Sequence, residues 1–340
     1  MMKFLSKKIF LGLVTSVFCW TGSIAIEARR PIQAQTLSAV QLYNQGVDQL
    51  AQGKYQEAID AFTQSLALNA EDADAFYNRA YAHHSLGQYD KAIADYEQAI
   101  NLKPDFANAY GNRCYAYYLI KQYQQSIDDC SQAIQLTPEF AGFYIYRANA
   151  LDESGKHQAA IADFNQAITL DPNNAKAFYN RGRTYNRIGE DEQAIADYTE
   201  SIRLDAKAAD AFYNRGASYL QIQKIDEAIE DFSAAINLNP QLTFAYGNRC
   251  NAYFLQQKYN QALTDCEKAL ELAPNNASFH VFRGNIYKAL GETQTAIADY
   301  QQAAELFKTQ DKPQSAAKVQ SLLENLQSGN SSSDSENGIE

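Results

Sequence analysis

The sequence has little of what catalysis and metal binding need. It contains four histidines, two methionines and one tryptophan in 340 residues. It has no glycine-rich phosphate loop, no Gly-x-Ser-x-Gly, no Cys-x-x-Cys and no His-Glu-x-x-His, which are patterns that hold reactive groups together. His83 and His280 fall at core places of helices, so His84 is the one candidate for a weak metal site. The sequence therefore supports neither an enzymatic function nor a bound cofactor.

Basic residues are also scarce. The chain has 29 Lys and Arg against 40 Asp and Glu, and its formal net charge is −11. Binding to nucleic acid needs a surplus of Lys and Arg to neutralise phosphates, preferably in a cluster. No such cluster is present. The composition therefore excludes nucleic acid as an expected partner.

Long apolar runs are missing except near the N-terminus. Three lysines precede the uncharged run IFLGLVTSVFCWTGSIAI at 9–26, and the end of this run carries the small residues Ser23 and Ala25. This order is typical of a secretory signal peptide, with cleavage expected near Ala25. The run is also just long enough to span a bilayer, so an uncleaved membrane anchor is the alternative. With residues 1–38 assigned to this segment and a linker, we expect the bulk of the chain to be exported, most simply to the periplasm.

The rest of the chain repeats every 34 residues. Residues 39–310 divide into eight units of equal length without insertion or deletion. Each unit holds two stretches with helical apolar spacing, separated by a break that often contains glycine, and proline closes five of the eight units. The units span 39–72, 73–106, 107–140, 141–174, 175–208, 209–242, 243–276 and 277–310.

This period, the small residues at the eighth and twentieth places of a unit and the closing proline resemble the tetratricopeptide repeat. The resemblance covers 39–310. It implies an all-α fold, a right-handed superhelical α-solenoid of helix-turn-helix units with a concave inner surface. Residues 311–327 carry an apolar stripe, so we expect a capping helix there. Residues 328–340 are polar and are expected to be disordered.

The sequence also has a longer period of four units. Units one and five both lack the closing proline, and units three and seven share the sequence GNRC and a second cysteine. Units four and eight replace an otherwise common asparagine with Tyr146 and Phe282. These paired departures indicate that a block of four units was duplicated.

Arginine and aspartate recur together. The seventh place holds Arg and the twenty-third holds Asp in seven units, whereas unit one has neither. Two antiparallel helices would bring these places to the same height, and their joint absence from unit one favours pairing within a unit. An Arg packed between helices needs a carboxylate, so we interpret the pairs as structural. The predicted pairs are Arg79 with Asp95, Arg113 with Asp129, Arg147 with Asp163, Arg181 with Asp197, Arg215 with Asp231, Arg249 with Asp265 and Arg283 with Asp299.

Asparagine recurs at the sixth place, which in superhelices that this chain resembles faces the inner groove. Its amide can bind a peptide backbone through both a donor and an acceptor, and tyrosine often precedes it. The resemblance therefore implies a peptide-binding groove, although the asparagines could instead cap or bridge neighbouring helices. The family's basic clamp for a terminal carboxylate is not matched. The candidate groove residues are Asn44, Asn78, Asn112, Asn180, Asn214, Asn248, Tyr43, Tyr77, Tyr179 and Tyr213.

Four of the five cysteines form two matching pairs. Cys114 and Cys250 stand at the eighth place, and Cys130 and Cys266 at the twenty-fourth, where the other units carry an aromatic residue. The two members of a pair should face each other across the hairpin. The pairs lie four units apart, which rules out a shared metal. An exported protein can keep disulfides, so we predict two of them, with reduced core cysteines as the alternative.

These observations favour a scaffold that binds extended peptide segments in the concave groove as an extracytoplasmic assembly or adaptor factor. The identity of the protein or peptide partner is not encoded in the repeats. One alternative is an assembly factor for a membrane complex, anchored by residues 9–26. Another is a carrier of a metal or small ligand, for which the features are His84 and the acidity of the chain.

Overall fold

The computed structural model describes residues 37–328, in which it contains seventeen helices and no strand. The all-α prediction is therefore confirmed for this part of the chain. The predicted export segment, including 9–26, and the predicted polar tail beyond residue 328 lie outside the described residues. Within 37–328, no helix combines the length and the apolar character needed to cross a membrane.

Each unit folds into two antiparallel helices, and the first helix begins at the first residue of the unit. The first helices are α1 (Ala39–Ala51), α3 (Ala73–Ser85), α5 (Ala107–Leu119), α7 (Ala141–Glu153), α9 (Ala175–Arg187), α11 (Ala209–Gln221), α13 (Thr243–Leu255) and α15 (Ala277–Ala289). The second helices are α2 (Tyr55–Leu68), α4 (Tyr89–Leu102), α6 (Tyr123–Leu136), α8 (His157–Leu170), α10 (Asp191–Leu204), α12 (Ile225–Leu238), α14 (Tyr259–Leu272) and α16 (Thr293–Thr309). A last helix, α17 (Pro313–Gln327), follows.

The break between the two helices depends on one left-handed residue at the fifteenth place. Five units place glycine there, as in Gly87 with a φ of 73°. Glycine adopts this conformation without steric cost because it lacks Cβ. Units three, six and seven use Lys121, Gln223 and Gln257 in the same conformation, at φ of 62°, 60° and 58°. These three turns are therefore strained relative to the glycine turns.

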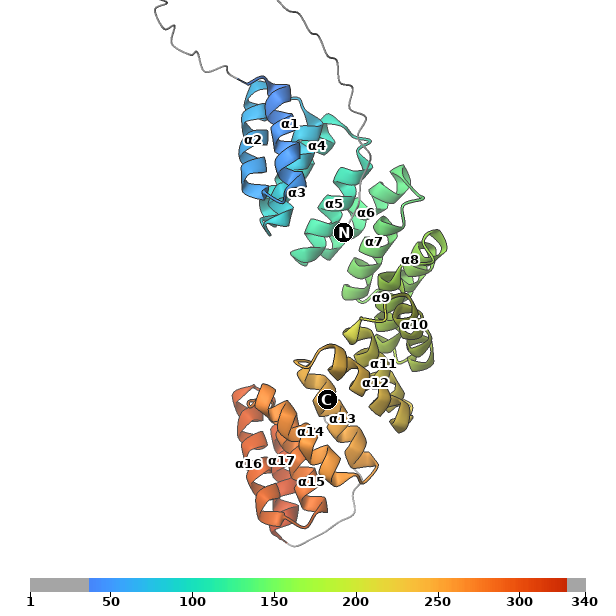
Figure 1. Ribbon diagram of the computed structural model, residues 1–340, viewed down its shortest axis with the longest axis vertical. Coiled ribbons are helices and arrows are strands. Elements are labelled where there is room, and N and C mark those ends of the chain that lie inside the picture. The colour runs from blue at the N-terminus through green and yellow to red at the C-terminus, as the bar shows by residue number, and fades with distance from the viewer. Residues whose placement is uncertain (1–36, 329–340) are drawn as a thin grey trace, which may run out of the picture. The chain divides into compact units, whose positions relative to one another are not determined.

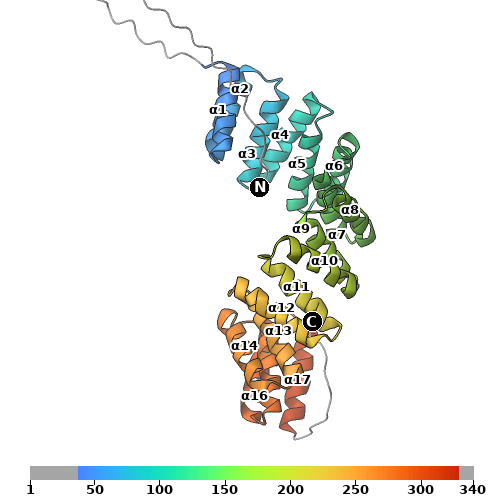
Figure 2. The ribbon, with the colours of Figure 1, turned by 45° about the vertical axis from the view of Figure 1, so that its right-hand side comes forward.

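The helices form two layers (Figures 1 and 2). Each second helix packs against the first helix of its own unit and against the first helix of the next. Each first helix also contacts the next first helix directly, from α1 through α15. The first helices thus form a continuous layer. We call its solvent-facing side the first-helix face; it carries exposed apolar side chains such as Val40, Val47, Tyr81, Phe244 and Leu255.

The core of an ordinary unit is an aromatic ring placed over a small residue. Phe62, Tyr96, Phe164, Tyr198, Phe232 and Tyr300 are buried at the twenty-fourth place. A Cβ on Gly46 would lie 2.6 Å from the Phe62 ring, so the glycine makes room for the aromatic side chain. At the C-terminal end, Val319 and Leu323 of α17 pack against Tyr300 and Phe307 of α16. Helix α17 therefore covers the last unit.

Candidate functional site

The seven arginines at the seventh place all pair with the aspartate of their own unit. Arg79 is typical: its Nε donates to Oδ2 of Asp95 and its Nη2 to Oδ1, each at 2.7 Å. The other six predicted pairs have the same two-point geometry. The seven aspartates are buried between the helices. Such pairs fix the two helices of a unit relative to each other and leave little carboxylate surface for a ligand.

These arginines also make a contact that the sequence analysis missed. In five units Nη1 donates to a polar side chain on the second helix of the preceding unit, as from Arg79 to Oγ1 of Thr63 at 3.1 Å. The other acceptors are Ser131, Asn165, Thr199 and Ser233. The arginines therefore bind neighbouring units together as well as the helices of one unit.

Burial changes the proton affinity of some of these carboxyl groups. Burial raises the pKa of Asp129 and of Asp197, and the hydrogen bonds from their arginines only partly offset it. At Asp299 burial acts in the same direction, but hydrogen bonds from His280 and Arg283 outweigh it and lower the pKa. This extra histidine bond, 3.2 Å from His280 Nδ1 to Oδ1, distinguishes unit eight.

The predicted groove asparagines and tyrosines meet between units. Asn78 Nδ2 donates to the Tyr43 hydroxyl of the preceding unit at 3.0 Å. Asn112, Asn214 and Asn248 contact Tyr77, Tyr179 and Tyr213 in the same way at 2.9, 3.0 and 3.3 Å. The amide nitrogens thus bridge neighbouring first helices, as the alternative interpretation expected, while Asn44 is exposed on α1. Their role in peptide binding stays a prediction.

We call this series of contacts between asparagines and tyrosines of neighbouring units the ladder. It changes at the boundary between units four and five. Unit four has Ile145 where a tyrosine would stand, so Asn180 of α9 donates instead to Oδ1 of Asn149 at 3.1 Å. Burial raises the pKa of the ladder tyrosines, that of Tyr77 to about 12. These phenols are therefore protonated at neutral pH and keep a hydrogen to donate. An intact step thus pairs an amide with a hydroxyl between first helices, and the interrupted step pairs two amides.

A cluster of stacked rings lies on this face in units two to four. Tyr115 of α5 stacks on His84 of α3 and on Tyr146 of α7, with ring centroids 5.4 and 4.9 Å apart. Tyr118 lies parallel to Tyr115 at 6.2 Å. Burial lowers the pKa of His84, which keeps the imidazole neutral. Among residues 37–328, no group of three or more His, Cys, Asp and Glu side chains is arranged to hold a metal ion.

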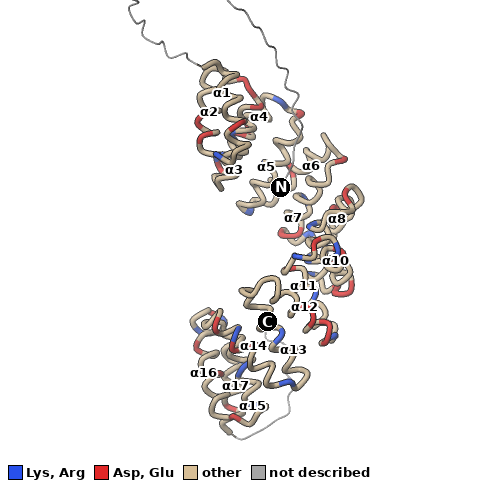
Figure 3. The backbone as a smooth tube through the Cα atoms, in the orientation of Figure 1, with Lys and Arg blue, Asp and Glu red and all other residues tan. Residues whose placement is uncertain are grey.

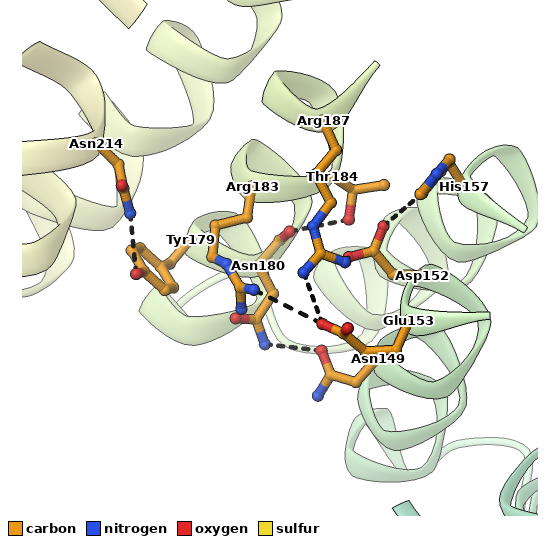
Figure 4. Close-up of polar contacts among 10 residues, drawn as sticks. All are labelled: Asn149, Asp152, Glu153, His157, Tyr179, Asn180, Arg183, Thr184, Arg187 and Asn214. Atoms are coloured by element: carbon orange, nitrogen blue, oxygen red, sulfur yellow. Dashed lines mark hydrogen bonds and ion pairs between the residues drawn. The ribbon is translucent and has the colours of Figure 1, made fainter. Parts of the chain in front are cut away.

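A charged cluster joins α7 to α9, where Figure 3 shows residues of both signs gathered near α7 to α10. Arg187 Nη1 donates to Asp152 at 2.6 Å and Nη2 to Glu153 at 2.7 Å (Figure 4). His157 Nδ1 lies 2.8 Å from the other Asp152 oxygen. Arg183 Nη2 lies 3.8 Å from the Glu153 oxygen that Arg187 already binds. This cluster was not predicted; its signal in the sequence is the acidic residues that end α7 and the two arginines four apart in α9.

The four cysteines at matching places form two disulfides within units three and seven. The Cα atoms of Cys114 and Cys130 are 5.4 Å apart, as are those of Cys250 and Cys266, and all four side chains are fully buried. The disulfide takes the space of the usual aromatic ring. Gly111, three residues before Cys114, instead contacts a buried ring of the next unit: a Cβ on Gly111 would overlap the Phe143 ring. The cysteine units therefore have a different core.

Tetratricopeptide repeat family models match most of the chain, at 43–105, 85–139, 148–189, 182–223, 209–242, 244–276 and 277–310. The chain belongs to the tetratricopeptide repeat family. Its helix pairs, its left-handed fifteenth residue and its cores of an aromatic ring over a small residue are the structural form of that repeat in this protein.

Solved structures similar to this tetratricopeptide repeat protein show the same fold. A repeat protein from Parabacteroides merdae is 20% identical with a TM-score of 0.54, covering 75% of this chain and 98% of that one. Pseudomonas aeruginosa PilF is 18% identical with a TM-score of 0.55, covering 64% and 97%. A chain of the Cut9–Hcn1 complex is 17% identical with a TM-score of 0.57, covering 80% and 52%. No curated protein matches the sequence.

Proposed function

We propose that this protein binds an extended peptide segment of a partner along the first-helix face, as an assembly or adaptor factor outside the cytoplasm. Tetratricopeptide repeats form protein–protein interaction scaffolds that are generally non-catalytic. Membership of this family therefore supports a role in binding other proteins. The particular face and the compartment are the parts we propose.

The observation that supports the face is its regular set of half-buried polar groups. Asn78, Asn112, Asn214 and Asn248 commit their amide nitrogens to tyrosine hydroxyls of the preceding units. Each asparagine then offers its carbonyl oxygen to a peptide N–H, and each tyrosine offers its hydroxyl hydrogen to a peptide carbonyl. Because these groups recur with the repeat, they suit an extended backbone whatever its side chains are.

A library experiment tests the face. A random-sequence peptide library displayed on phage is selected on the full chain and on a variant with Asn78, Asn112, Asn180 and Asn214 changed to Ala. We expect the wild type to enrich peptides and the variant to lose them while keeping its helical circular dichroism. The control variant carries Asn101→Ala and Asn237→Ala, which are exposed on second helices. Equal enrichment by the groove variant would show that peptides bind elsewhere.

The two buried disulfides support a compartment outside the cytoplasm, because disulfides persist where the redox environment is oxidising. The only tryptophan, Trp20, lies in the predicted export segment. If the segment is cleaved, protein purified from its native compartment lacks indole absorbance and fluorescence. Indole fluorescence in membrane-extracted protein would instead favour the anchored alternative.

A further inference from the structure

The two copies of the four-unit block differ on the first-helix face of their opening units. The framework places match: the tyrosines Tyr43 and Tyr77 of the first copy correspond to Tyr179 and Tyr213 of the second. The ninth and thirteenth places of the first unit do not match, because Val47 and Ala51 correspond to arginines in the second copy. Those are Arg183 and Arg187. The pair of cations therefore belongs to the junction of the two copies alone.

In the charged cluster that joins α7 to α9, Arg183 has a weaker ion pair than Arg187. Arg187 receives both carboxylates, at 2.6 Å from Asp152 and 2.7 Å from Glu153. Asp152 is further held by His157 at 2.8 Å. Among the described residues, the ion pair of Arg183 is a 3.8 Å approach to the Glu153 oxygen that Arg187 already binds. The charge of Arg183 is thus poorly compensated in the free protein.

Arg183 is also placed to meet a ligand. Its side chain is 38% exposed, and Figure 4 shows it beside Tyr179 and Asn180 on the same helix, reaching toward α7. Its charge acts to lower the pKa of Tyr118, Tyr179 and Tyr198, against the larger effect of burial. A part-exposed guanidinium whose ion pair is this weak is a setting that favours an added carboxylate.

We propose that Arg183 anchors an acidic side chain of the bound peptide, whose neighbouring residues lie over the ring cluster of units two to four. The acidic side chain forms a close ion pair with Arg183, whose own partner Glu153 lies 3.8 Å away. His84, Tyr115 and Tyr146 extend the same face with stacked rings, which suit apolar or aromatic peptide residues. This inference rests on the proposed function and adds the chemistry of the ligand.

The test uses the same phage-displayed library on the full chain. We expect wild-type selections to share one Asp or Glu at a fixed offset from aromatic or apolar residues. Changing that acid to Gln in a synthetic peptide should weaken binding to the wild type about tenfold and leave binding to Arg183→Ala unchanged. Arg183→Glu should select Lys or Arg at that position. The control is Arg203→Ala, an exposed arginine of α10 that bonds Glu200 within its own helix.

A gain-of-affinity variant guards against misfolding as an explanation. Glu153→Gln removes the carboxylate that competes for Arg183, so the acidic peptide should bind it several-fold more tightly. An acid preference that persists in Arg183→Ala, or an unchanged affinity in Glu153→Gln, overturns the inference. Peptides enriched without any acid preference overturn it too, but leave the proposed function intact. If the wild type enriches no peptide at all, the proposed function and this inference both fail.

Discussion

The first four units and the last four, which we interpret as copies of one block, share some features and differ in others. Several framework features are shared: both copies have the disulfide in the third unit and a following phenylalanine, Phe143 or Phe279, against a glycine. On the first-helix face they diverge, with stacked rings in the first copy and Arg183 and Arg187 opening the second. Packing constrains buried framework residues, whereas residues on the solvent-facing side are under no such constraint.

The strongest test of this comparison removes equivalent framework arginines. Arg79→Ala and Arg215→Ala each leave a buried aspartate, Asp95 or Asp231, without its partner. An unpaired buried charge costs about 3 kcal/mol or more. We expect both variants to lose stability on this scale in urea denaturation, because the two-point Arg–Asp geometry is the same; unit two differs in that His83 Nε2 also lies 4.0 Å from Asp95 Oδ2. A large loss in only one copy would show that the halves are not equivalent frameworks.

The disulfides provide the second test. Each closes a loop of 16 residues, for which about 3 kcal/mol of stabilisation is expected. Cys114→Ala with Cys130→Ala should therefore destabilise the chain about as much as Cys250→Ala with Cys266→Ala. Mass spectrometry of unreduced protein after alkylation should detect none of these four thiols. Four alkylated thiols would establish the reduced core and remove the disulfide contribution.

The fifteenth place allows a smaller test by exchange. Units two and six are equivalent, but the turn residue is Gly87 in one and Gln223 in the other, both left-handed. Gln223→Gly should stabilise the protein by about 1 kcal/mol, and Gly87→Gln should destabilise it by a similar amount. Thermal unfolding of the two single variants and the double exchange measures this. If the double exchange differs strongly from the wild type, the turns differ in more than local strain.

Most of the fold could be predicted from the sequence because the 34-residue repeat is regular. Helix pairing, the core of an aromatic ring over a small residue and the partner of each arginine follow from places within one unit, where distances are set by the hairpin. Contacts between units were harder to predict. The Asn78–Tyr43 bridge and the stack on Tyr115 depend on how far one unit rotates against the next, which single-unit spacing does not encode. The Arg183 cluster was missed for the same reason.

The smallest expected effect concerns proton binding by two framework aspartates. The pKa of Asp197 is raised above its ordinary value of 3.8 by burial, whereas that of Asp299 is lowered because His280 and Arg283 outweigh burial. Asp197 therefore stabilises the fold below pH 3.8 and loses this contribution as the pH rises through its raised pKa. Asp299 stabilises it above 3.8 and loses this contribution as the pH falls through its lowered pKa.

Carboxyl carbon NMR titration distinguishes these two aspartates, with Asp197→Asn and Asp299→Asn assigning the resonances. We expect Asp197 to titrate at the higher pH. Replacing His280 by Asn should move the Asp299 midpoint upward, since it removes the bond that unit eight adds to the shared framework pair. A coincidence of the two midpoints would mean that the histidine adds nothing, and that the seventh and twenty-third places are electrostatically uniform in units five and eight.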